Sequence, residues 1–327
     1  MKKIMTIFLL CALWSGIAIS HDEEIYTQNG YPIKSTNKDF VKISEQKQLT
    51  FKNKSDDIPG RFLYDQEDIT NDYQVHIIYI LASDSEDKKY DVNDTIKKIV
   101  LKTNDHFYIN NNKKFRLDLT KEGKLDISFI RVDKKKKKIS RIQNGAGYFT
   151  AEIIKHGFYN PKKLYAIFYQ DYYKREWGQV GNAFFYGPNK MIEINTSVTY
   201  LEKIPLKGAL RERVYLHELI HALGFVQLCA PGAIKDTGPW GKNDHLNYRD
   251  DVMSDSGGEN WYIDKKRIEY YDNSIPNCEM DLKKSAFLEP TEKDFQLQPM
   301  SKSCKLTRWQ PKYNHQRSLD CLARLNF

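Results

Sequence analysis

Cysteine is scarce in this chain. Only five of its 327 residues are cysteines, and none lies between positions 21 and 228. A thiolate from a pro-segment that follows residue 20 is therefore excluded as a metal ligand. Nucleic-acid-binding motifs and internal repeats are also absent. The one long apolar run, residues 4–19, is shorter than the roughly 20 apolar residues that a membrane span needs.

The first 20 residues have the pattern of a secretory signal peptide. Lys2 and Lys3 form a basic start, residues 4–19 an apolar core, and residues 18–20 (Ala-Ile-Ser) a small-x-small cleavage site. We therefore expect a secreted protein, extracellular or periplasmic, whose mature chain starts near His21 and has no membrane span.

Export permits disulfide bonds. Four cysteines remain after cleavage of the signal peptide, and four cysteines allow three pairings. We favour a bond between Cys229 and Cys278 across the C-terminal half, and a local bond between Cys304 and Cys321 near the end of the chain.

Composition indicates a folded globular protein. Hydrophobic residues make up 40% of the chain, charged residues 29% and aromatic residues 13%. The net charge is +8, and five consecutive lysines, Lys134 to Lys138, contribute much of the excess. We interpret this run as a solvated turn, with a patch for an anionic surface as the alternative.

The elements expected from the pattern give an α+β fold, a mixed twisted sheet with packed helices. We predict strands at 75–81, 115–119, 125–132, 164–169 and 191–195, and helices at 91–108, 147–157 and 208–225. Residues 177–183 are glycine-rich and predict a bend, and an irregular subdomain should follow the last helix. The expected divisions are 1–20 (signal peptide), 21–72 (extended N-terminal segment or pro-region), 73–290 (catalytic domain) and 291–327 (cysteine-containing tail).

The last predicted helix carries the pattern H-E-x-x-H. His217 and His221 are four residues apart, so their side chains lie on the same helix face and can bind one metal ion. Glu218 is the next residue around the helix, within reach of a water on that metal. Two imidazoles, an open position and a carboxylate are the parts of a catalytic zinc site. Gly224 should end the helix.

With Gly224, the motif reads H-E-x-x-H-x-x-G and resembles the metzincin metallopeptidases. In that family a third ligand follows the glycine by three residues, but here that position is Gln227, a poor zinc ligand. We therefore predict His245 as the third ligand. The other candidates are carboxylates: Asp244, Asp250, Asp251, Glu259 and Glu269.

The stretch Asp251-Val252-Met253-Ser254 resembles the methionine turn that lies beneath the zinc in metzincins. It also resembles secreted bacterial proteins of metalloprotease type, in which a His-Cys pair precedes Asp-Val-Met-Cys. Leu246 and Ser254 occupy the positions of the two cysteines in that pattern. If those cysteines form a disulfide, a chain that has lost the disulfide is expected to lack both.

The resemblance implies a secreted zinc-dependent endopeptidase that acts on a protein or peptide, with Zn²⁺ bound by His217, His221 and His245 and Glu218 as general base. Tyr248 or Tyr262 could stabilise the oxyanion, and an extended substrate could pair with residues 191–195 as an edge strand. Trp240 and Trp261 could line a side-chain pocket, although ordinary packing is the simpler interpretation. The alternatives are a zinc-containing binding protein, a latent or inactive homologue, or a hydrolase of a non-peptide amide.

Overall fold

The computed structural model describes most of the chain from residue 49 to residue 296. The described ranges are 49–142, 145–173, 177–187, 190–204, 209–227, 229–234, 245–254, 261–276, 278 and 281–296, with two short strands, β1 (Ile25–Tyr26) and β2 (Pro32–Ile33), before them. Among these residues, no helix is both long and apolar enough to cross a membrane.

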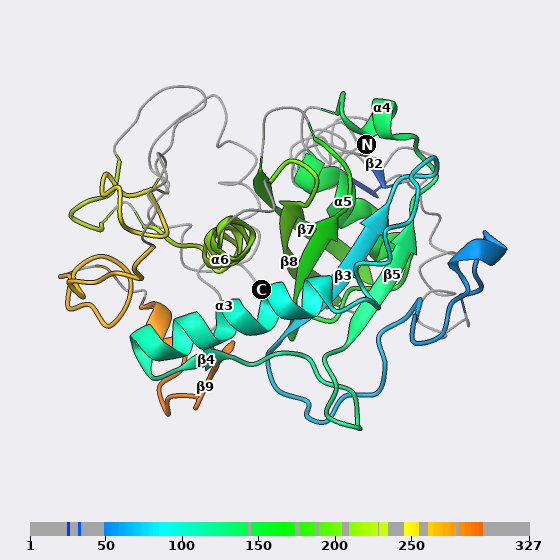
Figure 1. Ribbon diagram of the computed structural model, residues 1–327. Coiled ribbons are helices and arrows are strands. Elements are labelled where there is room, and N and C mark those ends of the chain that lie inside the picture. The colour runs from blue at the N-terminus through cyan, green and yellow to red at the C-terminus, as the bar shows by residue number, and fades with distance from the viewer. Residues whose placement is uncertain are drawn as a thin grey trace, which may run out of the picture.

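A five-stranded sheet forms the centre of the fold (Figure 1), in the order β5-β3-β6-β8-β7. Four strands are parallel, and β7 pairs antiparallel with β8. The strands are β3 (Gln74–Leu81), β5 (Ile127–Arg131), β6 (Lys163–Tyr169), β7 (Gly178–Gly187) and β8 (Lys190–Tyr200).

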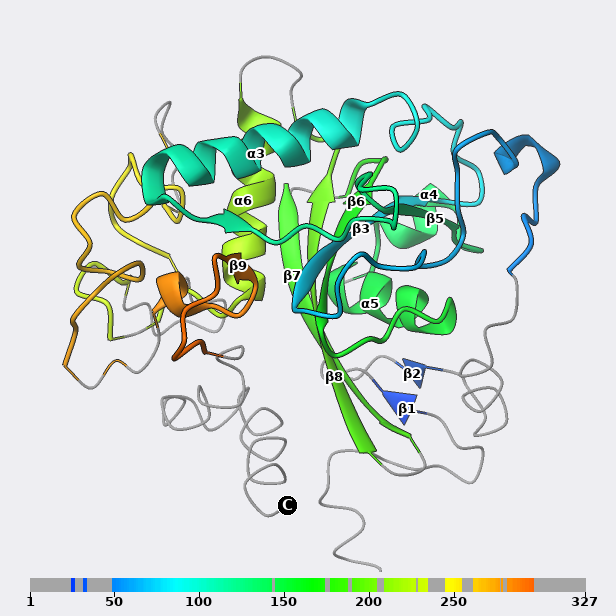
Figure 2. The ribbon, with the colours of Figure 1, turned by 90° about the horizontal axis from the view of Figure 1, so that it is seen from below.

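Helices cover both faces of this sheet. On β3, Ile77 and Tyr79 face a core shared with α3 (Thr95–Asn111) and α6 (Leu210–Ala222). The alternate residues, Ile78 and Ile80, face a second core with α5 (Gly145–Lys155), which lies across the sheet from α3 and α6 (Figure 2). All eight residues of β3 are buried, as expected for a strand covered on both faces.

The mixed sheet with packed helices is thus confirmed, with one correction and one refinement at its edge. Residues 177–183 do not form a bend, because β7 begins at Gly178 and pairs with β8 along its whole length. Residues 191–195 belong to β8, which lies between β6 and β7, but pairing with β6 begins only at Asn195, so this residue alone among the five has strand partners on both sides. Glycine lowers strand propensity, and it is found in strands where another group approaches the backbone closely.

Residues 115–119 form less regular structure than expected. Only β4 (Lys114–Phe115) is a strand, and it pairs with β9 (Leu288–Glu289) near the end of the described chain. Beyond α6 the described residues are largely irregular, as predicted: η2 (Leu282–Lys284) and β9 are the regular elements there.

The lysine run begins as a coil and continues into a short helix, α4 (Lys136–Ile139), rather than forming only a turn. All five lysines are exposed, which agrees with a solvated segment. An anionic binding surface there stays a prediction.

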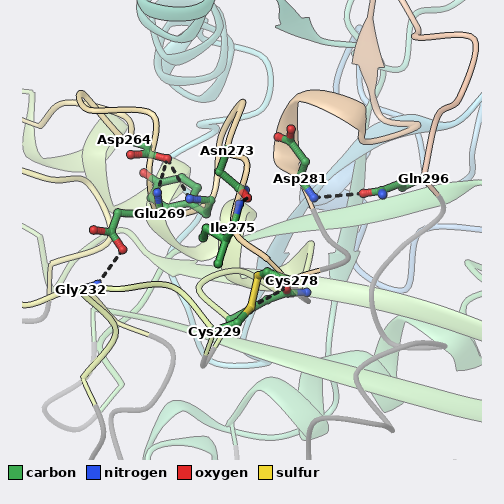
Figure 3. The surroundings of a disulfide bond; sticks show 11 residues. Cys229, Gly232, Asp264, Glu269, Asn273, Ile275, Cys278, Asp281 and Gln296 are labelled. Atoms are coloured by element: carbon green, nitrogen blue, oxygen red, sulfur yellow. Dashed lines mark hydrogen bonds between the residues drawn. A yellow bond between two sulfur atoms is a disulfide. The ribbon is translucent and has the colours of Figure 1, made fainter.

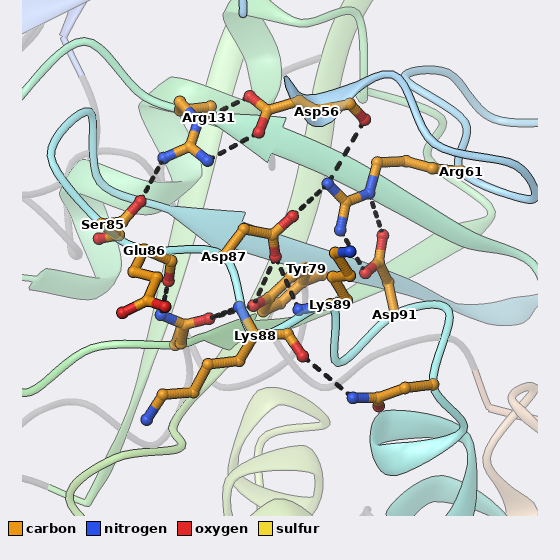
Figure 4. A network of polar contacts seen from close by, with 12 residues as sticks. Asp56, Arg61, Tyr79, Ser85, Glu86, Asp87, Lys88, Lys89, Asp91 and Arg131 are labelled. Atoms are coloured by element: carbon orange, nitrogen blue, oxygen red, sulfur yellow. Dashed lines mark hydrogen bonds and ion pairs between the residues drawn. The ribbon is translucent and has the colours of Figure 1, made fainter. Parts of the chain in front are cut away.

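Two residues of the N-terminal segment, Asp56 and Arg61, are held to the domain by buried ion pairs (Figure 4). The Arg61 side chain is fully buried and donates to both oxygens of Asp91 at 2.6 Å and to Asp87 at 2.6 Å. Arg131 donates to both oxygens of Asp56, the last residue of η1 (Lys54–Asp56), at 2.7 Å. Residues 56–61 are therefore part of the folded domain, to which these buried ion pairs connect them.

Candidate metal centre

Helix α6 presents one face to the core and another to the candidate site. Leu216, Leu219 and Ile220 are fully buried, whereas His217 and His221 are partly exposed. The helix ends at Ala222, and Gly224 follows in the left-handed region with φ +86°, where its N–H donates to His221. The predicted helix stop at Gly224 is confirmed.

Three histidines converge on one point. The Nε2 atoms of His217 and His221 are 3.0 Å apart, and His245 Nε2 lies 3.2 Å and 3.3 Å from them. His245 reaches this point from a loop 24 residues after His221. The structure thus brings together the three residues that were predicted from the sequence as ligands.

The orientation of the rings suits a metal. His217 Nδ1–H donates to the carbonyl oxygen of Val252 at 2.7 Å, and His221 Nδ1–H donates to that of Phe225 at 2.7 Å. Each neutral ring therefore carries its proton on Nδ1 and directs its Nε2 lone pair at the shared point. Burial and the neighbouring His221 hold the pKa of His217 well below its ordinary value, so this ring is neutral.

Converging lone pairs repel one another unless a cation lies between them. Zinc–nitrogen bonds of about 2.0–2.1 Å at tetrahedral angles place the ligand nitrogens about 3.3 Å apart. The three observed separations of 3.0–3.3 Å match that requirement. The three side chains therefore fit a zinc ion.

Backbone pairing holds His245 in place. Ile234 N–H donates to the His245 carbonyl oxygen at 2.8 Å, and Leu246 N–H donates to that of Met253 at 2.9 Å. Leu246 and Ser254 are partners in a β-bridge. These two positions are neighbours in space, which agrees with the interpretation that they replace a disulfide pair.

Gln227 occupies the position at which the metzincin pattern has its third metal ligand, but here its side chain contacts two cysteines. It is buried, and its Oε1 lies 3.1 Å from Cys278 Sγ and 3.4 Å from Cys229 Sγ. These two cysteines form a disulfide, which confirms the predicted bond (Figure 3). The Cys304–Cys321 pairing lies outside the described residues.

The turn at residues 251–254 packs directly against His217 through the Val252 carbonyl. The Asp251 carboxylate organises it by accepting from the N–H groups of Met253 (2.8 Å) and Asp264 (2.9 Å) and from the Tyr270 hydroxyl (3.0 Å). Burial raises the pKa of Asp251 to about 6. Asp251 therefore has structural partners of its own, and Met253 is fully buried.

The other carboxylate candidates are placed elsewhere or outside the described residues. Glu269 accepts from Gly232 N–H at 2.7 Å (Figure 3), and Asp250 is exposed. Asp244 and Glu259 lie outside the described residues, as does Trp240.

The aromatic candidates have packing partners. Trp261 stacks on His106 of α3 with ring centroids 3.7 Å apart, which supports ordinary packing. The Tyr248 ring lies over Gly232, and Lys265 lies over the Tyr262 ring. A role for either tyrosine at an oxyanion stays a prediction.

Glu218 is 8% exposed, and its side chain lies against Gly178 at the start of β7. No pattern in the sequence identified Gly178 as a neighbour of Glu218. The available signal was the pair of glycines at 178 and 181, but glycine alone does not distinguish a bend from a strand that another side chain approaches.

A second group with metal-ligand geometry lies at the start of β3. It consists of Asp65, His76, Asp118 and Asp126. Lys163 already supplies a cation there, because its Nζ donates to Asp65 Oδ1 at 2.6 Å and to Asp118 Oδ2 at 2.7 Å. We therefore interpret this group as a buried ion-pair network.

His76 is doubly protonated in this network. Its Nδ1–H donates to Asp118 at 2.7 Å, and its Nε2 lies 3.0 Å from the Ser128 hydroxyl. That hydroxyl donates its own proton to the Tyr64 carbonyl oxygen, so it accepts from Nε2–H. Burial lowers the pKa of His76, but Asp65 and Asp118 outweigh burial, and the net pKa lies above 6.5.

The protonated ring predicts a pH dependence of stability. A histidine with a raised folded pKa stabilises the fold fully below its unfolded pKa, and this contribution is lost as the pH rises through the folded pKa. Above pH 6.5 the free energy of unfolding should fall by up to about 1.4 kcal/mol per pH unit from this group. Urea unfolding of the zinc-saturated protein between pH 6 and 9 should show this slope, and His76→Gln should lack it. Equal slopes in both proteins would contradict the assignment.

Comparisons with known proteins give limited similarity. No protein-family model matches the chain, and no curated protein matches it. Wild-type OgpA from Akkermansia muciniphila is similar in two crystal forms, with 18% and 16% identity and TM-scores of 0.32 and 0.30. These matches cover 52% of both chains in the first form, and 55% of this chain and 54% of OgpA in the second.

Catalytically inactive OgpA in complex with an O-glycopeptide substrate, glycodrosocin, is also similar, with 15% identity, a TM-score of 0.29 and 52% coverage of each chain. The chain thus spans about half the length of the OgpA structures that it matches. Matches at this level assign neither a family nor a function, so the metzincin resemblance stays a prediction.

Proposed function

We propose that this protein is a secreted zinc-dependent endopeptidase. His217, His221 and His245 are the zinc ligands, and Glu218 is the general base. The observation that carries this proposal is the convergence of three Nε2 atoms within 3.0–3.3 Å of one another, two of them on rings whose Nδ1–H bonds direct the lone pair inward.

The chain's own groups account for the proton transfers of peptide hydrolysis. Zinc in this site would act as a Lewis acid that lowers the pKa of water and polarises the scissile carbonyl. The Glu218 carboxylate takes a proton from the attacking water and gives it to the leaving amine. Its low exposure of 8% removes competing solvent from the carboxylate.

The edge strand β7 offers a place for an extended peptide. Trp177 and Tyr200 are opposite each other, and Tyr200 N–H donates to the Trp177 carbonyl at 3.0 Å. Hydrogen-bonded and non-bonded pairs alternate in an antiparallel ladder, so the N–H and C=O groups of the next residue, Gly178, point away from β8, to the side where the described strands give β7 no partner. A substrate strand could pair with them beside Glu218.

A zinc-containing binding protein is the second candidate. A structural zinc site is closed by four protein ligands, whereas a catalytic site has three. Within the described part of the chain, the metal-ligand group at α6 consists of three histidines. Three protein ligands favour the enzyme. The carboxylate of Glu218 next to the ligands also favours it, because a closed structural site does not need a general base.

The test measures metal content and casein hydrolysis on purified residues 21–327. We expect one zinc per chain, and hydrolysis that a chelator blocks. His245→Ala should lower zinc affinity by more than the roughly 10- to 100-fold that loss of an outer-shell partner costs, because it removes a ligand. His156→Ala, a partly buried histidine at the end of α5, is the matched control and should keep its zinc. Unchanged zinc in His245→Ala would shift the third ligand to a carboxylate.

A further inference from the structure

We infer that Gly178 is a positioning residue for the Glu218 carboxylate, an inference that rests on the proposed peptidase function. The side chain of Glu218 lies directly against the Gly178 backbone. A Cβ atom at position 178 would lie 2.3 Å from Cγ, 2.5 Å from Cδ and 2.4 Å from Oε1 of Glu218. Every other amino acid carries this atom, so only glycine leaves the volume to the glutamate.

Space, and not backbone conformation, is the reason for glycine at this position. Gly178 is not among the glycines with positive φ, which include Gly60, Gly123, Gly157 and Gly224. An alanine could therefore adopt the same backbone conformation without strain, and its effect would come from the contact with Glu218.

The start of β7 cannot easily move aside. On one side of Gly178, the Trp177 carbonyl accepts from Tyr200 N–H at 3.0 Å. On the other side, Gln179 Oε1 accepts from Ala146 N–H at the start of α5 and from the Tyr200 hydroxyl, both at 3.0 Å. A methyl group at position 178 would therefore displace the Glu218 side chain rather than the strand.

Displacement of the carboxylate has a direct consequence for catalysis. A general base must lie within hydrogen-bonding distance of the water that it deprotonates. Misplacement by about 1 Å can lower the rate by about 100-fold. The three atoms nearest to the added Cβ all belong to Glu218 and none to His217 or His221, so zinc binding should be unaffected.

The first experiment measures zinc content, kcat and KM for Gly178→Ala. We expect one zinc per chain, a kcat about 100-fold lower on casein and a KM within about twofold of the wild type. A kcat equal to that of the wild type, a change in KM alone, or loss of zinc would overturn the inference.

The second experiment is a double-mutant cycle on thermal stability, which does not depend on catalysis. Glu218→Ala removes the atoms that the new methyl group would meet. Gly178→Ala should lower Tm in the wild-type background and leave it unchanged in the Glu218→Ala background. If Gly178→Ala fails to fold but the double variant folds, that result would also support the contact. Equal Tm losses in both backgrounds would overturn it. An inactive wild type would refute the proposed function, while the Tm cycle would still decide whether Gly178 makes room for Glu218.

Discussion

Replacement of Glu218 by glutamine is expected to leave one zinc per chain and to lower kcat for casein hydrolysis by about 10²- to 10⁴-fold. Glutamine has nearly the same shape as glutamate, so it fits the space beside Gly178 and disturbs the three histidines little. It cannot accept the proton of the attacking water, so the chemical step loses its base. Metal analysis and steady-state kinetics on the same preparation measure both effects.

Glu212→Gln is the matched control for this variant. Glu212 lies in the first turn of the same helix, partly exposed and 3.9 Å from Lys102, and its replacement should leave kcat unchanged. Full activity in Glu218→Gln would refute the role of Glu218. Zinc in both proteins with hydrolysis in neither would indicate a latent precursor or a binding protein that has kept the helix of an enzyme.

Replacement of Arg61 by methionine is expected to lower the free energy of unfolding by about 3–5 kcal/mol. The guanidinium is fully buried between Asp87 and Asp91 and lies 3.9 Å above the Phe129 ring, so its loss leaves two carboxylates without their cation. Protonation relieves a buried carboxylate, so the loss should be smaller at pH 5 than at pH 8. Urea unfolding of the zinc-saturated protein at both pH values measures it.

Lys52→Met is the control for Arg61→Met. Lys52 pairs with Asp133 at 2.8 Å, but both side chains are largely exposed, and such pairs contribute at most about 1 kcal/mol. Equal losses in the two variants would contradict a structural role of Arg61. If Arg61→Met shows this large loss of stability, removal of all residues up to 72 should destabilise the domain at least as much. A removable pro-region would then have to end before Asp56.

Local patterns in the sequence predicted the fold and the site where the determining contacts are local. The spacing of His217 and His221 and the stop at Gly224 are properties of one helix, and β3 follows from one run of apolar and β-branched residues that is buried throughout. The position of β7 depended on pairing with a strand that follows it, and its glycines lowered its strand propensity. Burial of Arg61 depended on carboxylates 26 and 30 residues away, which no periodicity in a polar segment reveals.

The pairing of β4 with β9 has a consequence for the order of folding. Arg116, just after β4, donates to the Ala286 carbonyl at 2.9 Å, across 170 residues of chain. Contacts between such distant segments form slowly, because the loop between them must close first. During synthesis, β4 has no strand partner until residues 288–289 have been made. We therefore expect the domain to reach its final packing late, after nearly all of its chain has left the ribosome.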